Sequence, residues 1–296
     1  MTRDQLIREL EFYQDLGLRT LHLPEAQPAA SANARGAKPA SPVPATVSPA
    51  TNSPGLEART PRAPVPAAGT PPSAPLQLRS LAVNAMPSMY DALGVDPKED
   101  SLTRIREDIG DCKRCRLCQG RNKIVFGAGN ESAKLVFVGE GPGEDEDHSG
   151  LPFVGRAGQL LTKMIEGTAE REGIAIQRKD VYICNVVKCR PPSNRKPEND
   201  EMEICGQFLY RQLAVLNPKA ICVLGATAAQ ALLNTKERIG KMRGEWFRWR
   251  EIPVMVTYHP SYLLRAYNAD AKREAWEDLK KALHFVYDDP ANLPKG

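Results

Sequence analysis

The chain has 296 residues, of which 42% are apolar and 26% charged, and its formal net charge is +4. No apolar run approaches the roughly 18 residues of a membrane-spanning helix, and the charged opening MTRDQLIREL is unlike a signal peptide. We therefore expect a cytoplasmic protein without membrane contact, in which an odd number of cysteines, seven, favours metal ligation over disulfides. The small positive charge is compatible with a polyanionic partner but does not require one.

Residues 1–23 predict a short amphipathic helix, because Leu6, Leu10 and Leu16 recur at near-helical spacing among charges. Residues 24–85 follow as a Pro/Ala-rich linker that holds thirteen of the 25 prolines. Such a segment buries too little apolar surface to offset its ordering entropy, so we expect it to be disordered. The helix before it is either a docking peptide for a protein partner or a terminal helix without function.

Residues 86–296 have the composition of a folded domain, which begins with a helix through Leu102, Ile105 and Ile109. Continuous apolar runs, typical of strands buried on both faces, occupy residues 135–139, 181–187, 220–225 and 252–258. Helical patterns occupy residues 156–172, 198–216, 227–233 and 271–285. This alternation predicts a three-layer α/β/α fold with a central, mainly parallel four-stranded sheet, whose ligand groups lie at the carboxyl ends of the strands.

Four cysteines have the spacing of metal ligands. Cys112 and Cys115 form a C-x2-C pair in a polar turn, while Cys189 and Cys205 are separated by fifteen residues. Two such segments can close one tetrahedral zinc site or hold an iron–sulfur cube, and the spacing leaves both open. Cys118 forms a second, overlapping C-x2-C pair and is a weaker candidate ligand. The remaining two lie inside predicted strands and fit ordinary burial: Cys184 and Cys222.

A glycine-rich turn follows the first predicted strand, in GEGPGEDEDHSGLPFVGRAGQLL. Its glycines allow backbone N–H groups to approach a ligand, but the spacing matches neither G-x-G-x-x-G nor a P-loop. The acidic residues 144–147 would repel phosphates, and we interpret Glu144 and Asp145 as part of a solvated loop. Phe153 either stacks on a planar base or anchors the core at the entry to the next helix.

Two polar residues mark the ends of later strands. Asn185 offers one amide donor and one acceptor, which match N3–H and O4 of uracil and mismatch cytosine. A structural Asn that bonds a nearby turn has equal weight. His259 follows the fourth predicted strand, which is a catalytic position, although a lone His is more often structural. Beyond it, Leu263 and Leu264 either plug a DNA stack or pack inward.

Together these motifs resemble the family 4 uracil-DNA glycosylases, the iron–sulfur-containing branch of the uracil-DNA glycosylase superfamily. The resemblance rests on CKRC, on GEGPGEDED followed by GLPFVGRAGQLL, on NVVKCRPPSNRKPENDE and on HPSYLLR, in family order across residues 111–286. It implies an enzyme of base excision repair that flips uracil out of DNA and hydrolyses its N-glycosidic bond, leaving an abasic site. It also implies a structural 4Fe-4S cluster with four ligands: Cys112, Cys115, Cys189 and Cys205.

The resemblance further implies roles for the pocket residues. Glu140 would position water or stabilise the sugar cation, and His259 would hydrogen-bond uracil O2, where charge develops as the base departs. Phe153 would stack on the base and Asn185 would read its edge. The rest of the pocket would come from the backbone of Gly141 and from Glu146 near uracil C5.

Contacts to DNA outside the pocket are implied for three residues. Ser261 would bind a phosphate, Leu263 would wedge into the space that the base leaves, and Arg243 would contact the backbone. A solvated basic loop is the alternative interpretation for Arg243. The extra thiol of Cys118 departs from the family pattern.

The expected partner is uracil-containing DNA, single- or double-stranded, bound by a monomer. A non-catalytic iron–sulfur module of the same fold, which binds DNA or recruits a polymerase, is the alternative function. An electron-transfer protein is a third hypothesis, but it would leave the pocket motifs unexplained.

Overall fold

The computed structural model describes residue 3, residues 100–265 and residues 268–289. The linker expected at residues 24–85 lies outside the described residues, as does the helix expected at residues 1–23 apart from residue 3. No helix in the described part of the chain is both long and apolar enough to cross a membrane.

The centre of the fold is a six-stranded sheet in the order β1-β3-β2-β4-β6-β5. The strands are β1 (Ala128–Gly129), β2 (Leu135–Gly139), β3 (Tyr182–Asn185), β4 (Ala220–Leu224), β5 (Trp246–Trp249) and β6 (Ile252–Thr257). The four inner strands run parallel, as predicted, and β1 and β5 join them antiparallel at the two edges. Neither edge strand was predicted, because β1 has two residues and β5 has four, with the exposed Arg248 interrupting its apolar run.

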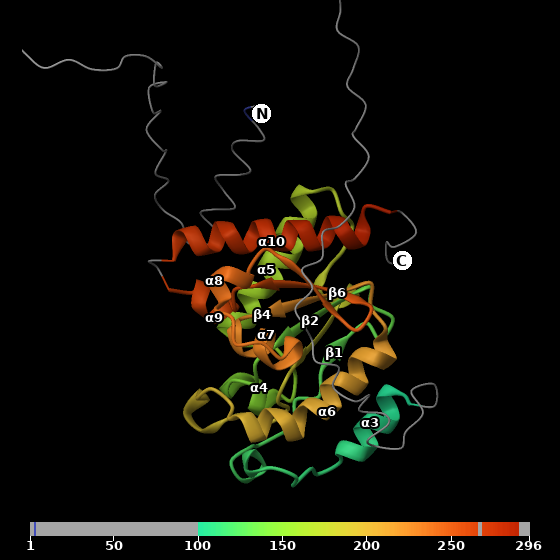
Figure 1. Cartoon of the computed structure of the whole chain (residues 1–296), viewed down its shortest axis with the longest axis vertical. Helices are drawn as coiled ribbons and strands as arrows, with labels where there is room; N and C mark the ends of the chain where they lie inside the picture. Colours follow the sequence, from blue (N-terminus) through green and yellow to red (C-terminus); the bar gives the residue numbers. More distant parts are fainter. Residues whose placement is uncertain (1–2, 4–99, 266–267, 290–296) are drawn as a thin grey trace, which may run out of the picture. The chain divides into compact units, whose positions relative to one another are not determined.

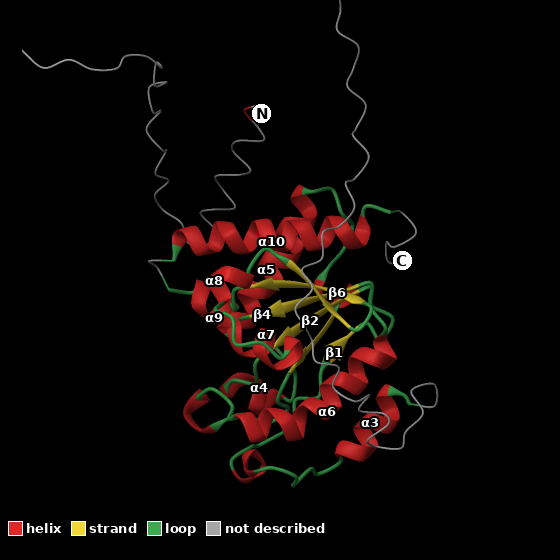
Figure 2. Ribbon diagram, in the orientation of Figure 1, coloured by secondary structure: helices red, strands yellow, loops and turns green. Residues whose placement is uncertain are grey.

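Helices cover both faces of this sheet (Figures 1 and 2). They are α3 (Leu102–Ile109), α4 (Glu144–Ser149), α5 (Arg156–Arg171), α6 (Asn199–Leu216), α7 (Ala226–Leu233), α8 (Ile239–Met242), α9 (Pro260–Leu263) and α10 (Ala269–Tyr287). Helices α5 and α10 pack in one core with one face of the sheet, and α3, α6 and α7 pack in another with the opposite face. The predicted three-layer α/β/α fold is therefore confirmed.

The inner strands are apolar without interruption because both of their faces are buried. Along β2, Leu135 and Phe137 enter the core of α5 and α10, while Val136 and Val138 enter the core of α3 and α6. This alternation follows from the two-residue period of a strand, and every residue of β2 is buried.

The strand register brings four carboxyl ends to one edge of the sheet. Gly139 of β2 pairs with Asn185 of β3, and Leu224 of β4 pairs with Thr257 of β6. The segments that leave these ends contain the glycine-rich turn, the second cysteine pair and His259. In Figure 2 the arrowheads of the inner strands accordingly point toward the side of the molecule that carries α8 and α9.

Candidate active site at the carboxyl ends of the strands

A cavity of about 560 Å³ opens at this edge of the sheet. The segments that follow β2, β3, β4 and β6 line it together with the start of α5. Seven residues with expected pocket or DNA roles lie in its wall: Glu140, Gly141, Glu146, Phe153, Asn185, His259 and Ser261. Segments more than a hundred residues apart in the sequence thus meet in one site, as the parallel sheet requires.

Asn185 supplies a buried polar group to the cavity wall. Its side chain is 1% exposed, and its Oδ1 has no hydrogen-bond partner among the described residues. A Cβ at Gly139, opposite Asn185 in the sheet, would lie 2.4 Å from this oxygen and 2.6 Å from the ring of Phe153. Glycine at that position therefore allows the amide and the aromatic ring to lie together at the base of the pocket.

Phe153 forms an aromatic wall of the cavity. Its backbone has a φ of 53°, a left-handed conformation, and its ring lies 5.6 Å from the ring of His259, centroid to centroid. A Cβ at Gly158 would lie 1.8 Å from the carbonyl oxygen of Phe153, so the loop can sit this close to α5 only because residue 158 is glycine. Phe153 is 6% exposed and packs in a core cluster, as the core-anchor interpretation predicts. It also lines the cavity, where stacking on a base stays a prediction.

Glu146 fastens this loop from the opposite side. Its Oε1 accepts hydrogen bonds from the backbone N–H groups of Val154 and Gly155, at 2.8 and 2.9 Å, and its Oε2 accepts one from Gly143 at 3.1 Å. The residue is 9% exposed, and three backbone N–H groups replace water as hydrogen-bond donors to its carboxylate. Glu146 therefore holds the glycine-rich turn and the Phe153 loop together at the pocket.

His259 presents one ring nitrogen as a donor. Its Nδ1 accepts from the backbone N–H of Ser261 at 3.2 Å and lies 2.7 Å from the Ser261 hydroxyl. In the neutral ring the proton consequently resides on Nε2, which can donate. Burial lowers the pKa of His259 to about 4, so the imidazole is neutral at physiological pH.

Glu140 is the first residue after β2, and its backbone oxygen accepts a hydrogen bond from Val187 N at 3.2 Å. Its partly buried side chain lines the cavity and makes no hydrogen bond or ion pair with the described residues. The fixed backbone and the uncommitted carboxylate suit a group that acts on water or on a cationic centre.

The segment after β4 also contributes to the cavity wall, which the sequence did not predict. Gly225 and Thr227 line the cavity, and a Cβ at Gly225, which has a φ of 91°, would lie 2.9 Å from the Cβ of His259. The signal was a Gly directly after a buried strand, one residue beyond the position level with Gly139 of β2. Arg156 and Arg195 also line the cavity and were not predicted, because arginines outside a motif carry little information in the sequence.

The structure corrects the solvated-loop interpretation of Arg243. Its guanidinium pairs with the fully buried carboxylate of Asp278 on α10 and donates to the backbone oxygen of Glu274 at 3.0 Å. Its side chain is 19% exposed and is not a solvated basic group. This pair attaches the loop before β5 to α10, and a contact of Arg243 with the DNA backbone stays a prediction.

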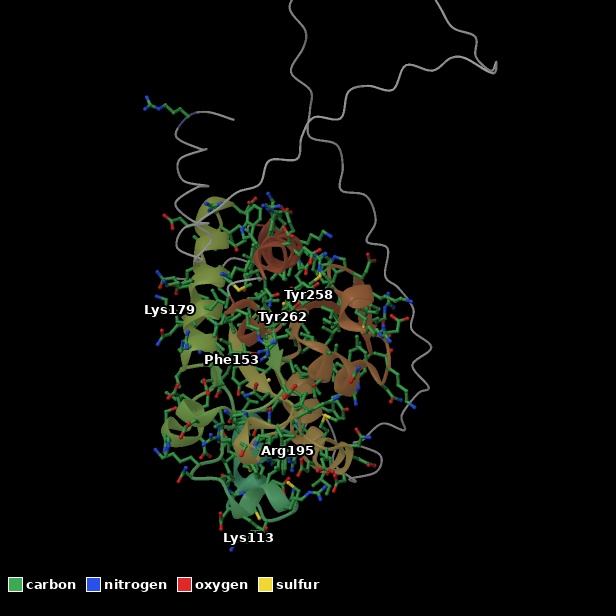
Figure 3. All side chains as sticks on the ribbon, turned by 90° about the vertical axis from the view of Figure 1, so that its left-hand side faces the viewer. Lys113, Phe153, Lys179, Arg195, Tyr258 and Tyr262 are labelled. Atoms are coloured by element: carbon green, nitrogen blue, oxygen red, sulfur yellow. The ribbon has the colours of Figure 1, made fainter. Side chains whose placement is uncertain are left out.

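The structure also corrects the prediction for Leu263. This side chain is 1% exposed and packs in the core with α5 and α10, so it cannot enter DNA without leaving that core. Its neighbours Tyr262 and Leu264 are 40% and 37% exposed. In Figure 3, Phe153 lies between the labelled Tyr262 and Arg195.

The two cysteine segments meet next to the pocket. Cys189 and Cys205 lie in one core cluster, and Cys112 and Cys115 pack against it. Sγ of Cys205 accepts a hydrogen bond at 3.2 Å from the backbone N–H of Lys188, the residue before Cys189. Arg121 joins the segments by donating to the backbone oxygen of Cys112 at 2.6 Å and to Sγ of Cys189 at 3.4 Å. The four candidate ligands therefore converge from both segments.

The two segments offer four thiols without imidazole or carboxylate, a donor set that suits either a tetrahedral zinc site or an iron–sulfur cluster. Within residues 100–265 and 268–289, no group of three or more Cys, His, Asp or Glu side chains is arranged to hold a metal ion. Cys118 lies near Cys115, because its backbone N–H donates to the Cys115 carbonyl oxygen at 3.3 Å.

Comparison with known proteins agrees with this geometry. Residues 126–280 match the family model described as the uracil DNA glycosylase superfamily. The type-4 uracil-DNA glycosylase of Thermotoga maritima is 44% identical over 193 residues, which cover 64% of this chain and 96% of that protein. The type-4 enzyme of Sulfurisphaera tokodaii is 43% identical over 190 residues, covering 62% and 83%.

A type-5 uracil-DNA glycosylase of Pyrobaculum aerophilum is only 28% identical, over 176 residues that cover 56% of this chain and 76% of that protein. The type-4 relatives are thus closer in sequence than this type-5 relative. The chain belongs to the uracil-DNA glycosylase superfamily and, within it, to the type-4 uracil-DNA glycosylases.

Proposed function

We propose that this DNA glycosylase flips uracil out of DNA and hydrolyses its N-glycosidic bond, leaving an abasic site. The observation that carries the proposal is the buried Asn185 Oδ1, which lacks a partner among the described residues and shares a cavity with the neutral donor His259. A buried acceptor without a donor is costly, and a ligand with an N–H group at this place removes the cost.

The base is selected by one amide and one ring. Asn185 accepts from N3–H of uracil through Oδ1 and donates to O4 through Nδ2, a pattern that cytosine reverses. Phe153 stacks on the face of the base. The carboxylate of Glu146, which three backbone amides hold in place, stands near C5 and leaves no room for the methyl group of thymine. The backbone of Gly141 completes this wall; a Cβ there would lie 2.7 Å from Cγ2 of Val187.

The bond between C1′ of the sugar and N1 of uracil breaks with both electrons remaining on the base. Negative charge then develops on O2, and Nε2–H of the neutral His259 donates to it more strongly in the transition state than in the ground state. Glu140 stabilises the sugar cation or orients the water that adds to C1′. A neutral donor suits this role because it stabilises the uracil anion without giving up its proton.

The loop after β6 holds the flipped nucleotide. Ser261 is exposed beside His259 and contacts a phosphate. Leu264 replaces Leu263 as the proposed wedge, because it is the leucine of the pair that reaches solvent. The DNA is single- or double-stranded.

The four convergent thiols hold a structural 4Fe-4S cluster in this proposal. Its ligands are Cys112, Cys115, Cys189 and Cys205. A cluster held there would cross-link the segment before β1 to the segments after β3 and would take no part in the reaction. Cys118 serves as a neighbour of the cluster.

The enzyme acts in base excision repair as a cytoplasmic monomer. Residues 86–296 are the proposed glycosylase domain, and the segment before it serves contact with a protein partner.

Uracil release provides the first test. Purified protein is incubated with labelled DNA that contains one uracil, and alkali then cleaves abasic sites. We expect cleavage at uracil only, with a loss of about 100-fold or more in Asn185→Asp, because a carboxylate cannot donate to O4, and in His259→Ala. A correctly folded, brown wild-type protein that releases no uracil would instead support the non-catalytic DNA-binding module.

The pH dependence of release tests the neutral donor. Because the pKa of His259 is lowered to about 4, its ring should remain neutral from pH 8 down to about pH 5. Single-turnover rates should show no loss from His259 protonation near pH 6.5, the ordinary histidine range. Circular dichroism at each pH checks folding. A midpoint near 6.5 that vanishes in His259→Gln would contradict this assignment.

The wedge is tested by two adjacent leucines. Leu264→Ala should slow uracil release from duplex DNA about tenfold or more with an unchanged Tm, because only an exposed side chain is lost. Leu263→Ala should instead lower the free energy of unfolding by about 2–5 kcal/mol, as expected for a buried leucine. Equal effects of both changes on duplex DNA at equal Tm would refute the assignment to Leu264.

Iron and sulfide analysis tests the cluster. Wild-type protein should contain about four of each per chain. Cys205→Ser should lose both, whereas Cys184→Ala, a buried cysteine in β3, and Cys118→Ser should retain them. Stoichiometric zinc in a colourless protein would overturn the cluster assignment and leave the glycosylase proposal standing.

A further inference from the structure

Lys188 is a fully buried lysine that the proposed reaction does not use. Its side chain is 0% exposed, and its Nζ donates to the backbone oxygen of Asn185 at 2.7 Å and to Oε1 of Gln212 on α6 at 2.6 Å. Burying a lysine costs several kcal/mol unless its N–H groups are satisfied. The two contacts satisfy it, and one of them is made to the residue that reads the base.

The carbonyl of Asn185 needs this donor because the sheet provides none. The N–H group of Val186 donates to the carbonyl oxygen of Gly139 in β2. The carbonyl of the preceding residue in a strand points the opposite way, so the carbonyl of Asn185 points toward the β1 side of β3. There β1 pairs with β3 only as far as Ile183. Beyond that point the hydrogen bond to the carbonyl of Asn185 comes from Lys188 Nζ instead of a neighbouring strand.

Lys188 is itself fixed from several directions. Its backbone N–H donates to Sγ of Cys205 at 3.2 Å, and its carbonyl accepts from Val125 N at 2.8 Å. Gln212 is held in turn by the hydrogen bond from its Nε2 to the carbonyl of Phe126, at 3.0 Å. An amine has two N–H groups even when it is neutral, so both of its contacts persist in either charge state.

We propose that Lys188 is a positioning residue for base recognition, which fixes the backbone of Asn185 and thereby aims its carboxamide into the pocket. The inference rests on the proposed function, because Asn185 is the residue through which Lys188 acts. A displacement of about 1 Å in such a group can cost about 100-fold in rate, so the effect of losing Lys188 should be measurable without loss of the fold.

The test is a double-mutant cycle on single-turnover uracil release. Lys188→Met retains the length of the side chain and removes its donors, and we expect the rate to fall about 10- to 100-fold. In an Asn185→Ala background the same change should have less than about a twofold effect, since the group that Lys188 positions is absent. Equal effects in both backgrounds would show a merely structural role and overturn the proposal.

Arg211→Met is the matched control. Arg211 lies beside Gln212 on α6 and is also buried, but its guanidinium pairs with Asp100 and Asp108, away from the pocket. Its loss should lower the Tm and leave the rate within about twofold. If Lys188→Met fails to fold, Gln212→Met replaces it in the cycle, because it removes the second anchor of the lysine.

A binding measurement separates this inference from the proposed reaction. Fluorescence anisotropy compares DNA containing uracil with the same DNA containing cytosine at that position. Lys188→Met should reduce the preference for uracil about tenfold or more, whether or not the wild type releases the base. Absence of release by the wild type refutes the proposed reaction alone, while a preference for uracil that is unchanged in Lys188→Met refutes the positioning role.

Discussion

The pocket depends on the parallel pairing of β2 with β3, which sets Gly139 directly opposite Asn185. Only a residue without a side chain leaves space there, because a Cβ would meet both the Asn185 oxygen and the Phe153 ring. The backbone hydrogen bonds continue past the strand ends, from Val186 N to Gly139 O and from Val187 N to Glu140 O. The Asn185 amide, the Phe153 ring and the Glu140 carboxylate are therefore located by one stretch of sheet.

Buried charged groups hold the surrounding loops in place. Glu146 joins the two loops of the glycine-rich motif, and Asp278 attaches the segment before β5 to α10. The carboxylate of Glu201, fully buried, pairs with Arg195 at the pocket and with Arg116 beside the cysteines. Hydrogen bonds from Arg195 hold the pKa of Glu201 at about 2. Removing one partner from such a group leaves an uncompensated buried charge, so these loops are held more rigidly than their irregular backbone suggests.

The chemistry of the pocket follows from the burial of its polar groups. Burial keeps His259 neutral, so its ring donates a hydrogen bond where an ordinary histidine would be in part a cation. The same burial leaves the Asn185 oxygen without a protein donor among the described residues. A neutral donor and an open acceptor in the same cavity as the Phe153 ring favour a planar, hydrogen-bonding base as the ligand.

The sequence by itself determined the four inner strands, the helices α5, α6 and α7 between them and seven of the residues that meet in the cavity. Continuous apolar runs and glycine at a strand end are local patterns, and a parallel sheet always gathers its carboxyl ends. Only the tertiary structure decided which way Leu263 and Arg243 turn, because the choice between core and solvent depends on α5 and α10, far away in the sequence. The position of Lys188 could not be predicted from the sequence either, since its burial depends on where β1 ends and on Gln212 of α6.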